Sequence, residues 1–357
     1  MKAHLLDPSS SKFDPKFEKL WDQFALEHQY GTIHQSTLWA HFKAQATNSN
    51  KYWLLLVTKG AALPKKASDI IGGSIIIRQA LPRGYSWLYC PRGPLLDYDD
   101  PSHTEKAFST ITKSLKSLAC EEKAIFLRVD PPLPKNHAKF ADFHPVKHGF
   151  QPENTLIIDL QHEEKAILEQ MKPKGRYNIR LADRKGVKVH EINPQDVTRF
   201  TLNMESFYDI LEETTERDGF SSHCRDFYRL MLETLIPTQN ATLYLAEYRK
   251  KIIAGIIVTF YGKIATYYYG ASSNDDRNVM APYLLQWRAM QAAKENGCDY
   301  YDLFGIAPPG AKHHPWAGVT SFKKKFGGQH SSYLPAHEYP FHKPLYWLYR
   351  IYKRFRH

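Results

Sequence analysis

Residues Ile252–Pro309 have the sequence IIAGIIVTFYGKIATYYYGASSNDDRNVMAPYLLQWRAMQAAKENGCDYYDLFGIAPP, and this stretch decides the fold. Short β-branched and aromatic runs on both sides of a Gly-Lys turn predict two strands. Pro282 suits the first turn of a helix, and Gly297 suits the position just past a helix end. The predicted elements are the strands Ile252–Gly262 and Ile264–Ser273, the helix Ala281–Asn296 and the strand Asp299–Pro309.

The same order of elements occurs earlier, at an offset of about 180 residues. It consists of Ile70–Gln79, Tyr85–Asp97, a helical pattern over Glu105–Ala119 and Ala124–Pro132. Both copies close on Pro-Pro. Similarity over this length implies two related units rather than a solenoid of short repeats. The connector His144–Thr155 is polar and contains glycine and proline, so we expect a domain boundary near residue 150. Strand, strand, helix, strand predicts an α/β fold with a mixed sheet flanked by helices.

The composition of the chain limits the classes of partner that we expect it to bind. The chain has 357 residues and a formal net charge of +11, which favours RNA, a nucleotide-linked substrate or an anionic membrane surface. Its four cysteines are far apart and form no CxxC pair, so neither a disulfide framework nor a zinc site is indicated, and a reducing cytoplasm fits best. The sequence contains no apolar run long enough to predict a secretory signal or a transmembrane helix.

A basic stripe lies in MKPKGRYNIRLADRKGVKV, Met171–Val189. On a helix, cations at every fourth position share one slowly drifting face, and we expect Tyr177 and Leu181 to anchor that helix to a core. The stripe is either a solvated face or a site for a polyanion such as an RNA backbone. Its cations are Lys172, Arg176, Arg180, Arg184 and Lys188.

The C-terminal segment Tyr339–His357, YPFHKPLYWLYRIYKRFRH, mixes aromatic and basic residues. This mixture is typical of a helix that lies in a membrane interface. A terminal helix packed on the first domain is the alternative.

Several stretches together resemble the FemABX peptidyltransferases, which add amino acids from aminoacyl-tRNA to peptidoglycan precursors. They follow the family's order and cover most of the chain. They are HQSTLWAHFK (His34–Lys43), YCPRGPLLD (Tyr89–Asp97), PKGRYNIRLADRKGV (Pro173–Val187), ETTERDGF (Glu213–Phe220), the segment Tyr267–Ile306 and GVTSFKKKFGG (Gly318–Gly328).

The resemblance implies two tandem acetyltransferase-like (GNAT) domains. No extended heptad pattern lies between Val189 and Tyr244, so the chain looks like the compact FemX-type members without a long coiled-coil insert. In those members the C-terminal segment completes the first domain. We therefore expect a precursor-binding domain of residues 1–150 with 335–357, and an aminoacyl-tRNA domain of residues 151–334.

The implied reaction is aminolysis of the aminoacyl ester by a stem-peptide amine, with no metal or cofactor. The acceptor is a lipid-linked (lipid II) or UDP-linked precursor, and the donor carries glycine, alanine or serine. The implied partners are aminoacyl-tRNA and this precursor, with peripheral contact of the tail at the inner membrane face. We expect a cytoplasmic monomer.

Site residues follow from the matching motifs. Lys323 in FKKKFG is the candidate for the cation that faces the oxyanion, although Lys324 and Lys325 adjoin it. A run of three lysines is otherwise a solvated turn. Arg217 and Thr215 match the segment that contacts the precursor diphosphate, with Lys43 as a second phosphate contact.

Asp97 is a candidate to hold the acceptor amine or take its proton, and turn capping is its alternative. Arg92 would support the acceptor, and Tyr269 would line the acceptor groove or pack in a core. For the basic stripe, the resemblance supplies a tRNA backbone as partner. Adjacent His313 and His314 are poorly placed to share a metal ion.

Two rival functions remain open. An acetyl-CoA-dependent acetyltransferase would need a Gly-rich loop at a helix N-terminus, but the corresponding stretches, Asp275–Leu285 and DYDDPSHTEKAF in the first repeat, lack glycine and carry aspartates. A non-catalytic RNA- or membrane-binding protein would keep the basic stripe but give Arg217 and Lys323 no role.

Overall fold

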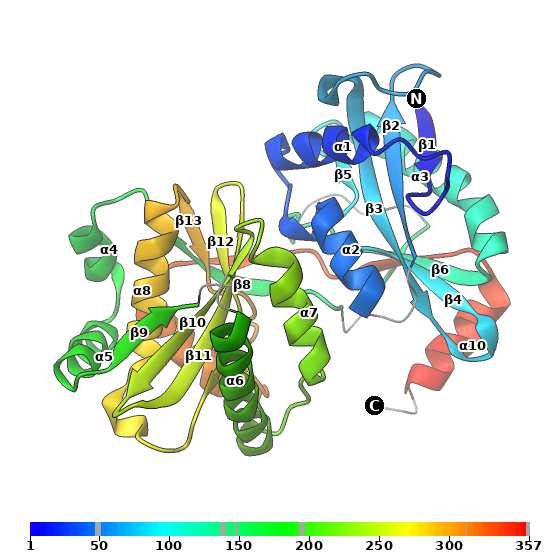
Figure 1. Cartoon of the computed structure of the whole chain (residues 1–357). Helices are drawn as coiled ribbons and strands as arrows, with labels where there is room; N and C mark the ends of the chain where they lie inside the picture. Colours follow the sequence, from blue (N-terminus) through cyan, green and yellow to red (C-terminus); the bar gives the residue numbers. More distant parts are fainter. Residues whose placement is uncertain are drawn as a thin grey trace. The chain divides into compact units, whose positions relative to one another are not determined.

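The structure is a computed structural model that describes residues 1–46, 51–135, 140, 142–146, 149–192, 197–311 and 313–354. The chain divides into two compact units, Met1–Glu153 with Tyr333–His357 (unit 1) and Asn154–Ser332 (unit 2). The expected boundaries at 150 and 334 lie close to these. Each unit is a mixed sheet with helices against it (Figure 1), which confirms the expected fold class.

Unit 1 is built on a sheet in the order β1-β2-β3-β4-β6-β15-β7, with β5 paired to β3. The first four strands are antiparallel, and β4 and β6 are parallel because helix α3 crosses between them. The strands are β1 (Lys2–Leu6), β2 (Tyr52–Thr58), β3 (Ile70–Ala80), β4 (Ser86–Cys90), β5 (Leu95–Leu96), β6 (Ala124–Val129), β7 (His144–Pro145) and β15 (His337–Pro340).

Helices cover both faces of this sheet, so β2 is buried along its whole length. One core lies between the sheet and α3 (Pro101–Glu121), and a second lies against α1 (Lys16–Glu27) and α2 (Thr37–Ala46). The chain returns after unit 2 to add β15 beside β6, and α10 (Lys343–Arg354) then packs on β6. The C-terminal segment thus completes the first unit.

Unit 2 repeats the design. Its sheet has the order β14-β8-β13-β12-β11-β10-β9, with antiparallel β10, β11 and β12 and a parallel β12–β13 pair joined through α8. Its strands are β8 (Asn154–Asp159), β9 (Lys188–Glu191), β10 (Ala241–Tyr248), β11 (Lys251–Tyr261), β12 (Ile264–Ser272), β13 (Tyr300–Asp302) and β14 (Gln329–Ser332). Its helices are α4 (Glu164–Gln170), α5 (Pro173–Arg184), α6 (Val197–Asp218), α7 (Arg225–Leu235), α8 (Ala281–Glu295) and α9 (Ala317–Lys323).

The repeat predicted from sequence is present in both units, with two differences of detail. The stretch expected as one strand over Tyr85–Asp97 is divided into β4 and β5 by the Pro-Arg-Gly-Pro turn. The stretch expected over Asp299–Pro309 is a strand only for Tyr300–Asp302. Between β9 and β10 the described residues form α6 and α7, which pack on the sheet rather than forming a coiled-coil arm.

Candidate functional site

The two parallel strands at the centre of unit 2 separate after a short pairing. Their register ends at Thr266 of β12 and Asp302 of β13, whereas β12 continues to Ser272. A bulge in β12 makes Tyr268 an extra residue against β11. Bulges re-aim side chains and are common beside functional sites. In open α/β sheets, ligands often bind where neighbouring strands diverge.

The bulge sends three consecutive tyrosines in different directions. Tyr267 packs against the core that α8 covers, and Tyr268 stacks on Phe304 with ring centroids 4.8 Å apart. Tyr269 meets Tyr228 of α7 edge-on at 5.0 Å. Burial raises the pKa of Tyr269 well above its ordinary value, and the charge of neighbouring tyrosines adds to this. Tyr269, named as a candidate for the acceptor groove, therefore has a packing role on the α7 side.

Lys323 lies at the end of α9 and is 6% exposed. Its ammonium donates to the carbonyl of Gly305 at 2.8 Å and lies 5.2 Å from the ring centroid of Tyr267. Burial lowers the pKa of Lys323 to about 8, and the negative charge of Asp302 opposes this shift. A buried cation beside separated strands can stabilise developing negative charge strongly, because water does not screen it.

Burial distinguishes Lys323 from its two neighbours. Lys324 is exposed and Lys325 is half-buried. The inward positions of this segment are Thr320, Lys323 and Phe326, which recur every third residue through the end of α9 and the 3₁₀ turn that follows. The solvated-turn interpretation fits Lys324, whereas Lys323 faces the interior.

The loop after β13 fixes the carbonyl that Lys323 contacts. Phe304 adopts a left-handed conformation with φ of 58°, and its amide donates to Asp302 Oδ1 at 2.7 Å. The amide of Ala307 donates to Thr320 Oγ1 at 2.8 Å. Gly305 lies between these two anchored amides, so the lysine and its acceptor are held in one geometry.

Arg217 and Thr215 lie at the end of α6. The Arg217 guanidinium donates to the Ser272 carbonyl at 2.8 Å, and its Nε and Nη2 donate to both carboxylate oxygens of Asp218 at 2.8 and 2.9 Å. The hydrogen bonds to Asp218 raise the pKa of Arg217. The Thr215 hydroxyl donates to a carbonyl of its own helix. Arg217 thus ties α6 to the end of β12. A phosphate would have to compete with Asp218 for the Nε and Nη2 donors of the Arg217 guanidinium.

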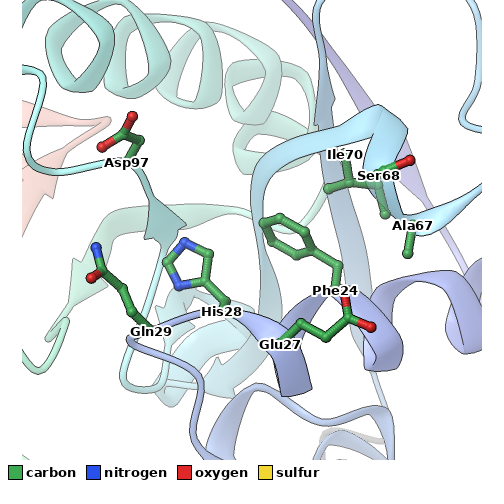
Figure 2. A pocket seen from close by; sticks show the side chains of 8 residues that line it. All are labelled: Phe24, Glu27, His28, Gln29, Ala67, Ser68, Ile70 and Asp97. Carbon is green, nitrogen blue, oxygen red and sulfur yellow. The ribbon is translucent and has the colours of Figure 1, made fainter.

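In unit 1, Asp97 follows β5 and is exposed. It lines a pocket of about 420 Å³, and Figure 2 shows Asp97 on the strand side and His28 on the side of α1. Burial lowers the pKa of His28, which the charge of Asp97 partly offsets. Asp97 Oδ1 also accepts from the amide of Asp99 at 3.2 Å. Asp97 therefore caps the turn and lines the pocket at the same time. The pocket is lined by Phe24, Glu27, His28, Gln29, Ala67, Ser68, Ile70 and Asp97.

Lys43 and Arg92 differ from simple surface charges. Lys43 is half-buried on α2, and desolvation lowers its pKa to about 8. Arg92 is 5% exposed; its guanidinium donates to the Pro152 carbonyl at 2.9 Å, and its amide donates to buried Asp130 at 2.5 Å. These contacts favour a structural role for Arg92 in holding the turn after β4.

The basic stripe is shorter than its spacing indicated. Helix α5 ends at Arg184, Gly186 follows in a left-handed conformation with φ of 82°, and Lys188 belongs to β9. The anchoring prediction was wrong: Tyr177 is 55% exposed and Leu181 is only half-buried. The inner face consists instead of two small residues, one apolar residue and one asparagine, and α5 packs on α8. That face is Gly175, Asn178, Ile179 and Ala182.

Four cations of the stripe are exposed, namely Lys172, Arg180, Arg184 and Lys188. Arg176 instead donates to the Met171 carbonyl at 2.5 Å. The start of α5 packs on the segment that carries Lys323. The amide of Lys172 donates to the Lys325 carbonyl at 3.0 Å, and a Cβ on Gly175 would lie 2.4 Å from that oxygen. The basic helix and the buried lysine are thus parts of one packed assembly.

Asp302, Phe304 and His28 are not among the residues predicted from the sequence. A carboxylate within the otherwise apolar and aromatic run YYDLFGI was a visible signal for Asp302. Nothing in the sequence distinguishes His28 from other histidines. Within the described part of the chain, no group of three or more His, Cys, Asp or Glu side chains is arranged to hold a metal ion. His314 Nδ1 accepts from the amide of Trp316 at 3.0 Å.

Comparison with known proteins agrees with this architecture. Curated relatives include the "Lipid II:glycine glycyltransferase" of Staphylococcus saprophyticus, 22% identical over 91% of this chain and 92% of that protein, and that of Staphylococcus haemolyticus, 22% identical over 92% of each. A solved structure of FemX matches with a TM-score of 0.79 and 19% identity, covering 98% of this chain and 99% of that one. A tandem GNAT protein from the clavulanic acid biosynthesis pathway matches with a TM-score of 0.51 and 10% identity, covering 95% and 99%.

These structural likenesses confirm a tandem GNAT-like fold. The family comparison reaches further, because the FemAB family matches residues 18–146, 139–251 and 246–354, which together span most of the sequence. The chain therefore belongs to the FemAB family.

Proposed function

We propose that this protein is an aminoacyltransferase of peptidoglycan bridge formation. It moves an amino acid from aminoacyl-tRNA to the stem-peptide amine of a peptidoglycan precursor on the cytoplasmic side of the membrane. Family membership supports the reaction class, and the names of the curated relatives favour lipid II as acceptor and glycine as the amino acid. A UDP-linked acceptor, and alanine or serine as donor groups, are the alternatives that the assay below separates.

The reaction is an ester aminolysis. The amine nitrogen attacks the ester carbonyl, the carbonyl electrons move to oxygen, and the tetrahedral oxyanion collapses with loss of the ribose hydroxyl. One proton leaves the amine and one reaches the departing ribose oxygen. The protein has to align two substrates and stabilise the oxyanion.

The observation that carries the proposal is buried Lys323. Within the described part of the chain, its ammonium donates to one protein acceptor, the Gly305 carbonyl. An ammonium has three donors, so it can donate to a substrate oxygen without leaving its place. The pKa of about 8 keeps most of this lysine protonated at neutral pH.

Each unit takes one substrate in this proposal, except that Arg217 of unit 2 is assigned to the precursor. Unit 1 would hold the precursor, with Asp97 in the pocket of Figure 2 as the group that binds the acceptor ammonium and takes its proton, and Lys43 as a phosphate contact. Arg217 would bind the diphosphate by exchanging Asp218 for phosphate oxygens. Unit 2 would hold the aminoacyl-tRNA along the exposed cations of α5.

An acyl-CoA donor is the rival reaction. CoA pyrophosphate in such a fold needs free amides at the start of the helix after β12. Here α8 follows Met280, in a left-handed conformation, and a connection that contains exposed Asp275 and Asp276. Carboxylates at this place repel pyrophosphate. Thermal stabilisation by acetyl-CoA would favour the rival.

A matched pair of variants tests the proposal. Purified protein is incubated with each charged tRNA in turn and with both precursor forms, and products are read by mass. Lys323→Met should abolish transfer while precursor and tRNA binding persist. Lys324→Met changes an adjacent exposed lysine and should transfer normally. Equal turnover of the Lys323→Met variant and the unmodified protein would refute the mechanism.

A further inference from the structure

The last helix, α10, has two apolar faces. Its inner face covers β6: Tyr346 is fully buried, its ring lies 5.7 Å from that of Phe126, and its hydroxyl donates to Glu338 at 3.1 Å. A helix packed in this way ordinarily shows polar residues on the opposite side. The opposite side of α10 is apolar. Its exposed residues are Trp347 (48%), Leu348 (62%), Ile351 (51%) and Tyr352 (55%).

These four residues form one continuous surface, here called the outer ridge. At 3.6 residues per turn, positions 348, 351 and 352 point away from the side that carries Tyr346, and Trp347 lies at the edge, with its ring 5.4 Å from that of Tyr346. Cations lie along one flank, since exposed Lys343 lies one turn before Trp347 and the Arg350 guanidinium lies 5.5 Å from the Trp347 ring. The sequence of α10 contains no Asp or Glu.

A basic pocket of about 720 Å³ adjoins the start of α10. It lies where the end of α3 meets the connection between β15 and α10. Lys116, Lys123 and Lys343 line it, together with His342, and none of the described residues that line it is a carboxylate. Its floor is apolar and aromatic, with contributions from Tyr85, Ile125, Tyr339 and Phe341.

We propose that the outer ridge and this pocket form a docking surface for an anionic lipid bilayer. Trp347 and Tyr352 suit the boundary between headgroups and acyl chains, where amphipathic rings concentrate. Leu348 and Ile351 enter the acyl region, and the lysines of the pocket meet headgroup phosphates. None of the helices in the described part of the chain is long and apolar enough to cross a membrane, so this contact is peripheral.

Charge distinguishes the bilayer from a protein partner. Protein interfaces are depleted of lysine at their centres, whereas here exposed Lys343 lies one turn before Trp347 at the edge of the ridge. In a twofold contact between two copies, the same cations would face each other, which is unfavourable. The inference does not depend on the transfer reaction, because bilayer binding needs neither substrate.

Vesicle sedimentation with the full chain tests the ridge. The probes are vesicles of phosphatidylcholine alone and of phosphatidylcholine mixed with phosphatidylglycerol. Leu348→Gln with Ile351→Gln should lower partitioning into the anionic vesicles by on the order of tenfold, with an unchanged thermal midpoint because both side chains are exposed. The control, Leu26→Gln with Leu202→Gln, removes two equally exposed leucines elsewhere and should bind as the unmodified chain does.

A second pair of variants tests the pocket. Lys116→Gln with Lys123→Gln should lower partitioning by about fivefold for each lysine, and only for anionic vesicles. Lys59→Gln with Lys65→Gln, two exposed lysines outside the pocket, should have a smaller effect. Three results would overturn the inference: equal binding of ridge variant and control, equal binding to neutral and anionic vesicles, or absence of vesicle binding with a dimer that the ridge variant abolishes.

Discussion

Replacing Lys323 by methionine should alter stability with a distinctive pH dependence. The folded protein holds the ammonium with a pKa of about 8, against 10.5 for an ordinary lysine. Below pH 8 both folded and unfolded states carry the charge, and the folded state bears the full desolvation penalty. At 1.36 kcal/mol per pKa unit, that penalty is about 3 kcal/mol. Methionine has a similar shape but carries no charge, so the Lys323→Met variant does not bear this desolvation penalty.

The sign of the pH effect follows from proton binding. Between pH 8 and 10.5 the unfolded lysine holds more protons than the folded one, so the stability of the lysine protein rises with pH. The methionine variant lacks this contribution. At pH 7 the variant loses the bond to Gly305, which costs about 1 to 3 kcal/mol, so its net stability is equal or somewhat higher. Between pH 7 and about pH 9.5, the unfolding free energy of the unmodified protein should rise by about 2 kcal/mol relative to that of the Lys323→Met variant.

Urea denaturation of both proteins at pH 7 and at the higher pH measures this difference. Other titrating groups are common to the two proteins, so their contributions cancel. Lys324→Met serves as control, because an exposed lysine should show no such trend. A difference between the Lys323→Met variant and the unmodified protein that stays constant with pH would refute the inference that this ammonium is desolvated.

Three further predictions concern the proposed site. Gly175→Ala places a Cβ 2.4 Å from the Lys325 carbonyl oxygen, so it should cost about 1 to 3 kcal/mol in urea denaturation and lower kcat by displacing α5. Arg180→Gln with Arg184→Gln should raise the KM for charged tRNA and reduce the slope of log affinity against log salt by about 1.5 to 2. Asp97→Asn should lower transfer by about 100-fold, measured as kcat/KM for the precursor, if it accepts the proton.

Each of these has a matched control. Gly318→Ala lies in open space on α9 and should leave stability and kcat unchanged. Arg176→Gln alone should change the salt slope little, because that guanidinium already binds a carbonyl of its own chain. Asp99→Asn alters the neighbouring exposed carboxylate. Any control that behaves like its test variant would remove the corresponding assignment.

Predictions of helix boundaries are confirmed where they rest on capping residues and wrong where they rest on the spacing of charges. Helix α8 runs over Ala281–Glu295, as Pro282 and Gly297 indicated. Cations that recur every fourth residue predict a helix that continues to Lys188, whereas α5 ends at Arg184 and Gly186 is a stop signal. Like charges do not drive helix formation, whereas a left-handed glycine ends one.

Where adjacent residues are of the same type, the sequence does not predict which of them faces the site. Three adjacent lysines look alike in FKKKFG, and only the turn at the end of α9 determines that Lys323 is buried while Lys324 is exposed. Similarly, YYYGAS does not reveal the bulge that directs Tyr267 and Tyr269 to different faces. The order of strands around these residues was predictable, because it depends on apolar runs and turns rather than on single side chains.

The return of the chain to complete the first sheet has a consequence for biosynthesis. Strand β6 is translated long before β15, its partner, because all of unit 2 comes between them. Until the ribosome has made residues 337–340, β6 has an open edge, and Arg128 lacks the carboxylate of Glu338 that it binds in the finished protein. A message truncated within unit 2 therefore yields an unfinished first sheet prone to aggregation and proteolysis. The cell thus makes both halves together or neither in a stable form.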